Sequence, residues 1–108
     1  MPNHYEVELA PAAEAGLRSL DKSEQRLVVR QLEKLSRAPQ LGEPLGTKMG
    51  TALAGYRKLY AARRRVRIIY SIESGKLVVS VIAIGAREDA KVYLIADAEA
   101  QKRLRRLS

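Results

Sequence analysis

The sequence predicts an α+β fold: a small twisted, mainly antiparallel four-stranded sheet with an N-terminal α-hairpin packed on one face and a short C-terminal helix, in the order β-α-α-β-β-β-α. Two observations lead to this class. Runs with the alternation or the β-branched composition of strands occur once before and three times after a stretch with helical periodicity. That stretch carries start and stop signals for two helices. With 108 residues, the chain is expected to form a single domain, 1–108, around one core.

The first strand and the first helix are predicted from the N-terminal segment. In HYEVEL, residues 4–9, apolar and polar residues alternate, as they do in a strand with one wet face. Pro11 suits the first turn of a helix, because its missing N–H would have no partner there. We expect this helix to cover about residues 11–20.

A second, longer helix is predicted to complete the hairpin. Asp21, with Glu24 three residues later, resembles a capping box, and Ala38-Pro39 stops the helix after Arg37. Its apolar residues fall on one face, and the basic ones fall on nearly the opposite face: Arg26, Arg30, Lys34 and Arg37. We interpret this basic stripe as a solvated helix face.

The second half of the chain is predicted to supply three strands and a last helix. Glycines and a proline make residues 40–55 an irregular connection within the domain. Three strands follow: 56–60, 65–72 and 77–84. The last two are expected to be joined by a tight turn at Ser74-Gly75. Because 77–84 is apolar on both faces, it should be a central strand. A helix is expected over 95–107.

The charge of the chain is concentrated in its second half. The formal net charge is +8 and the pI is about 10.1. Residues 1–54 hold seven Lys/Arg and seven Asp/Glu, whereas residues 55–108 hold thirteen and five. This distribution is typical of a nucleic-acid binder or of a protein with an acidic protein partner, and charge alone does not separate the two.

The composition excludes several classes of protein. There is no cysteine, so neither a disulfide framework nor a thiolate metal site can form. No apolar stretch approaches the roughly 20 residues that a membrane span needs, and the N-terminus lacks the pattern of a signal peptide. We therefore expect a cytoplasmic protein that does not contact a membrane.

The order of elements and two sequence stretches resemble a known superfamily. VRIIYSI (66–72) and VIAIGAREDAKVY (81–93) are similar to the corresponding strands of the RelE/ParE superfamily of bacterial toxins, and the likeness covers residues 5–93. The resemblance implies a toxin of a type II toxin-antitoxin system, with a functional surface on the sheet face opposite the helical hairpin. RelE-like members cut mRNA in the ribosomal A site, whereas ParE-like members poison DNA gyrase without that chemistry.

The resemblance to RelE-like nucleases implies four catalytic residues. An arginine after the glycine that ends the last strand, and a tyrosine six positions beyond it, match Arg87 and Tyr93. An arginine in the penultimate strand matches Arg67. A basic residue just after the tyrosine of the preceding strand matches Arg57, which follows Tyr56.

One position departs from the pattern of RelE-like nucleases. Those proteins often carry a second basic residue two positions further along the same strand, where this chain has Leu59, and the hairpin before Arg67 has one extra residue. Other cations are expected to contact the RNA in its place, either Lys58 or one of three arginines in the loop, and the spacing does not assign which: Arg63, Arg64 and Arg65.

These residue types suit RNA cleavage without a metal. A 2′-hydroxyl must lose its proton and attack the neighbouring phosphorus, and arginine can hold the phosphate oxygens with its planar fork. Arginine cannot be the base, and a single histidine, His4, excludes a paired-histidine nuclease. Tyr93 could serve as the base if guanidinium groups favour its phenolate, or it could stack on a nucleobase.

No metal or cofactor is expected. Four acids in the C-terminal part could suggest a Mg²⁺ nuclease: Glu88, Asp89, Asp97 and Glu99. Acids at a strand end and on a helix are usually solvated, so we interpret them as surface residues.

The leading hypothesis is a ribosome-dependent, metal-independent mRNA endonuclease of the RelE type. Its expected partners are the ribosome, mRNA and a cognate antitoxin, with no small-molecule cofactor. The alternatives are a ParE-like inhibitor of gyrase without catalysis and a decayed, inactive toxin.

Overall fold

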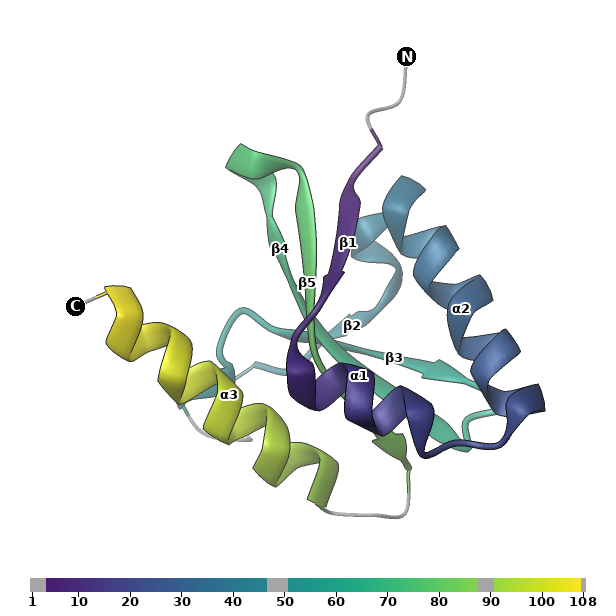
Figure 1. Ribbon diagram of the computed structural model, residues 1–108. Coiled ribbons are helices and arrows are strands. Elements are labelled where there is room, and N and C mark those ends of the chain that lie inside the picture. The colour runs from purple at the N-terminus through teal and green to yellow at the C-terminus, as the bar shows by residue number, and fades with distance from the viewer. Residues whose placement is uncertain (1–3, 47–50, 88–90, 108) are drawn as a thin grey trace.

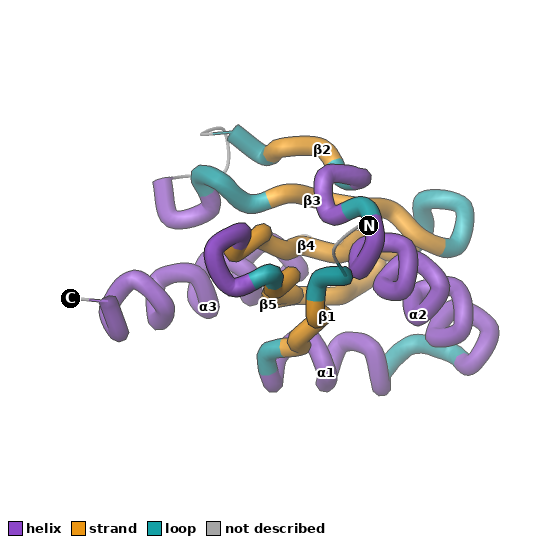
Figure 2. The backbone as a smooth tube through the Cα atoms, turned by 90° about the horizontal axis from the view of Figure 1, so that it is seen from above, coloured by secondary structure: helices purple, strands orange, loops and turns teal. Residues whose placement is uncertain are grey.

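The fold is built on one open, twisted sheet. The computed structural model describes residues 4–46, 51–87 and 91–107. Within them the sheet has five strands in the order β1-β5-β4-β3-β2 (Figure 2). The strands are β1 (Glu6–Leu9), β2 (Glu43–Pro44), β3 (Arg57–Ala61), β4 (Val66–Glu73) and β5 (Val78–Ala86). Only the β1–β5 pair is parallel among these strands; the other pairs are antiparallel.

The predicted α+β class is confirmed, with one addition at the edge of the sheet. The two-residue strand β2 lies in the stretch predicted to be irregular and pairs with Arg57 and Lys58 of β3. A strand of two residues that includes a proline has no alternation to detect, which explains why the sequence predicts only four strands.

Three α-helices accompany the sheet in the described residues: α1 (Pro11–Arg18), α2 (Lys22–Arg37) and α3 (Lys91–Leu107). The predicted cap of α2 is confirmed, because the Asp21 carboxylate accepts a hydrogen bond from the Glu24 N–H at 2.8 Å. This bond is the main reason why the pKa of Asp21 lies below its usual value.

The helix α3 begins at Lys91, earlier than the predicted residue 95. Val92, Ala96 and Ala100 recur every four residues and are all buried, so its inner face starts in its first turn.

The helices cover opposite faces of the sheet (Figure 1). One core lies under the α1–α2 hairpin and includes Val28, Leu35 and Ile68. The other lies under α3 and includes Ile69, Ile82 and Val92. β5 contributes to both cores, which confirms the prediction that it is central.

Helix α1 packs unusually close to β5. A Cβ atom added at Gly16 would overlap the carbonyl oxygen of Ile84. The absence of a side chain at Gly16 therefore sets the distance between this helix and the sheet.

In two turns of the sheet, residues other than glycine have the positive φ of the left-handed region. The predicted turn at Ser74-Gly75 joins β4 and β5 but is longer than a two-residue turn: Glu73 and Val78 form the last pair of these strands, and Leu77 has a φ of 55°. The β3–β4 turn places three successive residues in the same region: Ala62 (53°), Arg63 (56°) and Arg64 (70°). Each such residue costs about 1–2 kcal/mol, so this turn is held by its surroundings.

The end of β5 ties down the β3–β4 turn. The Arg87 N–H donates to the Arg65 carbonyl oxygen at 2.7 Å, and the Arg65 N–H donates to the Ala62 carbonyl oxygen at 3.1 Å. The turn and the start of the segment after β5 therefore lie side by side, at the end of the sheet where α3 begins.

Candidate functional site

Four cations surround one tyrosine on the α3 face of the sheet. Tyr60 of β3 pairs with Arg67 of β4, so both side chains lie on the face opposite the α1–α2 hairpin. The distances from the Tyr60 ring centroid are 5.1 Å to Arg64 Cζ, 5.5 Å to Lys58 Nζ, 5.6 Å to Arg67 Cζ and 5.8 Å to Arg87 Cζ. These lie within the roughly 6 Å over which a cation interacts with an aromatic ring.

A second tyrosine completes the arrangement from the first turn of α3. The Arg67 Cζ lies 4.5 Å from the centroid of the Tyr93 ring, so this guanidinium is shared between two tyrosines from different elements. We refer to the six residues together as the Tyr60 cluster: Lys58, Tyr60, Arg64, Arg67, Arg87 and Tyr93.

Arg67 is held in place at a cost. Its Nε is buried and has no hydrogen-bond partner within the part of the chain that the structure describes. A buried donor without a partner costs about 1–3 kcal/mol. Such groups are uncommon in native proteins and concentrate where function needs them.

The phenol of Tyr60 is more acidic than an ordinary tyrosine. The pKa of Tyr60 is lowered, first because its hydroxyl hydrogen-bonds to Arg67 and then because of hydrogen bonding to Lys58 and the charges of both cations. Partial burial opposes this shift but does not cancel it. Tyr60 is only half-buried, so solvent reaches it.

Sequence reasoning missed Tyr60, although a signal was present. Leu59 and Ala61 pack into the hairpin core, so the alternate residues Lys58 and Tyr60 must face the other side of the strand. The resemblance, counted from Arg57, places the second basic residue at Leu59, whereas the same spacing counted from Lys58, which lies on the site face, falls on Tyr60.

The structure does not bring Arg57 together with the other predicted catalytic residues. Arg57 pairs with Tyr70, on the face of the α1–α2 hairpin. Its Nη1 donates to the Gly42 carbonyl oxygen at 2.7 Å. The Tyr70 hydroxyl donates to the Pro39 carbonyl oxygen at 2.7 Å and accepts from the Gly42 N–H at 2.8 Å. Arg57 therefore fastens the 39–42 segment to the sheet.

The three arginines of the β3–β4 turn have different environments. Arg64 reaches the Tyr60 ring, whereas Arg63 and Arg65 are exposed and make no ring contact among the described side chains. The positive charge of Arg65 makes a small contribution to the lowered pKa of Asp21, behind the hydrogen bonds to the Asp21 carboxylate.

The predicted acidic residues do not form a metal site in the described part of the chain. No group of three His, Asp or Glu side chains with suitable spacing occurs there. The Asp97 carboxylate accepts a hydrogen bond from Gln101 at 2.8 Å, and Glu99 is buried. Glu88 and Asp89 lie outside the described residues.

No described helix has the length and the apolar surface to cross a bilayer.

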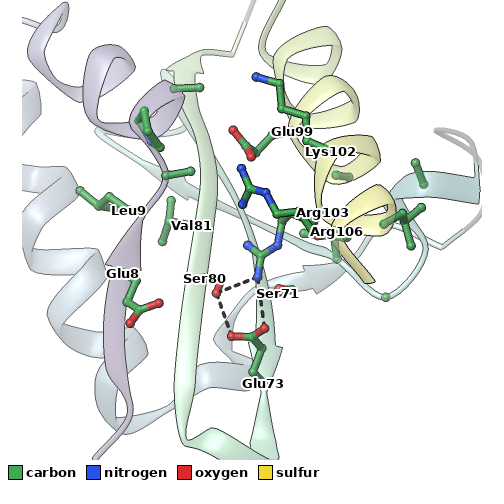
Figure 3. A pocket seen from close by; sticks show the side chains of 18 of the residues that line it. Glu8, Leu9, Ser71, Glu73, Ser80, Val81, Glu99, Lys102, Arg103 and Arg106 are labelled. Atoms are coloured by element: carbon green, nitrogen blue, oxygen red, sulfur yellow. Dashed lines mark hydrogen bonds and ion pairs between the residues drawn. The ribbon is translucent and has the colours of Figure 1, made fainter. Parts of the chain in front are cut away.

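A pocket of about 720 Å³ lies between α3, β5 and the junction of β1 with α1 (Figure 3). Inside it, Arg103 Nη2 donates to Glu73 Oε1 at 3.1 Å and to Ser80 Oγ at 3.2 Å, and Ser80 donates to Glu73 Oε2 at 3.1 Å. None of its lining residues belongs to the Tyr60 cluster. Arg103, Glu73 and Ser80 thus satisfy one another in the pocket, and we take the Tyr60 cluster, where four cations converge on one ring, as the candidate functional site.

The Tyr60 cluster combines two kinds of group that suit contact with a polyanion. Fixed guanidinium groups bind phosphate oxygens, and half-exposed tyrosine rings bind nucleobases. The model of one protein family, described as the ParE toxin of the type II toxin-antitoxin system parDE, matches residues 7–91 of this chain. The chain therefore belongs to this toxin family, within the RelE/ParE superfamily.

Solved structures of RelE toxins share the fold. A chain of the RelBE2 toxin-antitoxin complex from Mycobacterium tuberculosis is 27% identical, with a TM-score of 0.65, covering 80% of this chain and 94% of that chain. A mutant of the E. coli RelE toxin in the free state is 22% identical, with a TM-score of 0.70, covering 94% and 98%. The archaeal RelE-RelB complex from Pyrococcus horikoshii is 20% identical, with a TM-score of 0.58, covering 81% and 99%. A comparison with curated proteins finds no match.

Proposed function

We propose that this toxin is a ribosome-dependent, metal-independent mRNA endonuclease of the RelE type, inhibited by a cognate antitoxin. The observation that carries the proposal is the Tyr60 cluster. It presents cations from β3, the β3–β4 turn, β4 and the end of β5 around two tyrosines on one exposed sheet face.

The cluster supplies the groups that RNA cleavage requires. When the 2′-oxygen attacks phosphorus, the phosphorane gains negative charge, and the 5′-oxygen then departs with a proton. In our proposal Arg67 and Arg87 hold the phosphorane oxygens and Tyr93 contributes its ring or its hydroxyl. One preorganised donor at such a centre is worth about 2.7–4 kcal/mol of the barrier.

Ribosome dependence would supply what the cluster alone does not. The cluster lies outside the pocket, and its cations can contact the RNA backbone without reading the sequence. In-line attack requires the 2′-oxygen and the phosphorus to be held within about 3–3.5 Å. In our proposal the ribosome supplies this alignment for the mRNA.

The antitoxin is proposed from the family and from the solved relatives. The matched family consists of toxins of toxin-antitoxin pairs, and two of the solved relatives are complexes of a toxin with its antitoxin. An acidic segment would complement the positive second half of this chain.

A second candidate function is inhibition of DNA gyrase. The specific observation in its favour is that the matched family is described by ParE and parDE. In that case the Tyr60 cluster would be an interaction surface without a chemical step.

One pair of assays tests the proposal. The purified protein is added to programmed ribosomes, with mapping of mRNA 5′ ends, and in parallel to gyrase with plasmid DNA. We expect A-site cleavage that Arg67→Ala abolishes and Arg105→Ala preserves. Arg105 is exposed near the end of α3 opposite Tyr93, so both variants lose one positive charge. Inhibition of gyrase without mRNA cleavage would overturn the proposal.

A further inference from the structure

Tyr60 has the position that a proton acceptor needs, and this inference rests on the nuclease function proposed above. The groups that face its ring come from every neighbouring element: Lys58 from β3, Arg64 from the turn, Arg67 from β4 and Arg87 from the end of β5. All four are cations, whose nitrogens donate hydrogen bonds and offer no acceptor. Within the Tyr60 cluster, the oxygen atoms of the side chains belong to the two tyrosines, Tyr60 and Tyr93.

The two tyrosines of the cluster meet Arg67 in different ways. Tyr93 presents its ring face, because the Arg67 Cζ lies 4.5 Å from its centroid. Tyr60 lies farther from Arg67, at 5.6 Å from Arg67 Cζ to its ring centroid, but three further cations lie within 5.8 Å of the same ring. These positive charges favour a negative oxygen on Tyr60, in the same direction as the lowered pKa of its hydroxyl. The four surrounding cations thus point to Tyr60 for the oxygen chemistry, and the closer ring contact points to Tyr93 for holding Arg67.

We propose that the Tyr60 phenolate is the general base that takes the proton of the attacking 2′-hydroxyl, while Tyr93 holds Arg67 and stacks on a nucleobase. As the proton moves to the Tyr60 oxygen, the 2′-oxygen bonds to phosphorus and the P–O5′ bond breaks. The departing 5′-oxygen takes a proton from solvent. Tyr60 then returns its proton to water, which its half-exposed position allows.

The first test needs no ribosome and uses the absorbance change of tyrosine ionisation. The chain has five tyrosines. In the wild type we expect one of them to ionise before the others as pH rises, because cations lower the pKa of Tyr60. Tyr60→Phe should remove this early step and Tyr93→Phe should leave it. An early step that survives Tyr60→Phe would overturn the assignment.

The second test is the pH dependence of single-turnover cleavage on saturating ribosomes. The wild-type rate should rise with pH and level off near the early ionisation step. Tyr60→Phe should slow cleavage roughly hundredfold or more and flatten the profile, whereas Tyr93→Phe should keep its inflection. Tyr60→Phe retains the ring and its cation contacts, and melting temperatures check the fold. Wild-type protein without cleavage overturns the proposed function together with this inference; normal cleavage by Tyr60→Phe overturns the inference alone.

Discussion

Arg57 and Lys58 are neighbours in sequence with the same charge, yet they lie on opposite faces of β3. Arg57 donates to the carbonyl oxygen of Gly42, and Lys58 lies 5.5 Å from the Tyr60 ring centroid. The alternation of a strand therefore divides two similar side chains between a structural and a functional task.

Substitution of these two residues should separate stability from activity. Arg57→Ala should lower the free energy of unfolding by about 1–3 kcal/mol, because it removes a charged hydrogen bond, and leave the cleavage rate of the folded fraction unchanged. Lys58→Ala should leave stability within about 0.5 kcal/mol and slow the chemical step. Denaturant unfolding and single-turnover cleavage measure the two effects. Loss of activity in Arg57→Ala beyond its loss of folded protein would contradict this division.

Arg87 should matter for the reaction and little for the fold. Its side chain is exposed, so Arg87→Ala should change the free energy of unfolding by no more than about 0.5 kcal/mol. Loss of one contact to the phosphorane should slow single-turnover cleavage roughly hundredfold or more. Arg63→Ala, an equally exposed arginine without a ring contact among the described residues, is the matched control. A wild-type rate in Arg87→Ala would show that the reaction does not need this residue.

At the scale of elements, the close approach of α1 to β5 should make a substitution that normally stabilises a helix lower the stability of the protein. Alanine is favoured over glycine inside a helix by about 1 kcal/mol. At Gly16, however, the added methyl group would meet the Ile84 backbone, which cannot move aside as a side chain can, and overpacking costs typically 1–3 kcal/mol. We expect Gly16→Ala to lower the melting temperature. Gly75→Ala, where a methyl group meets no atom within 4 Å, should leave it nearly unchanged.

The elements could largely be predicted because long periodic signals dominate them. The capped helix α2 and the apolar strand β5 both lie close to their predicted ranges. The features that were missed depend on which residues pair across the sheet. β2 exists only because β3 offers it hydrogen bonds, and the turn after Glu73 is set by the Glu73–Val78 pair.

The candidate site was predictable where residues stand at fixed spacings within a short sequence motif. Arg67, Arg87 and Tyr93 do converge, through the shared contact of Arg67 with both tyrosines and the position of Arg87 beside Tyr60. Arg57 and Tyr60 show the opposite case. The sequence match chose Arg57 because it follows Tyr56, and this choice is one residue away from Lys58, which lies on the site face of β3. Only the pairing of β3 with β4 shows which side chains of β3 lie on that face.

The charge distribution of the whole molecule predicts steep salt dependence. Four cations of the Tyr60 cluster are available to phosphates, and each phosphate contact on a single strand contributes about −0.7 to the slope of log K against log salt. Binding to programmed ribosomes, followed by sedimentation, should therefore weaken with a slope of about −3 or steeper. Arg87→Ala should make the slope shallower. A flat response would indicate a target other than nucleic acid.

Binding of the antitoxin should protect the basic half of the molecule. The β3–β4 turn has three exposed arginines in succession, Arg63 to Arg65, and is an accessible site for trypsin in the free protein. In the complex we expect slower cleavage over residues 55–67, read by mass spectrometry, while cleavage at the exposed Arg26 of α2 continues. Protection confined to residues 1–20 would contradict this docking site.

The parallel pairing of β1 with β5 has a consequence for the order of folding. It pairs Glu6 with Val78, so β1 cannot join the sheet until β5 has formed. Closing so long a loop costs chain entropy before any contact rewards it, and such non-local topology slows folding. Until β5 arrives, the apolar faces of β1, α1 and α2 have no complete partner. The chain should therefore expose apolar surface during folding, and this surface favours aggregation. The lifetime of the partly folded state, rather than the stability of the native state, should then limit the yield of refolding.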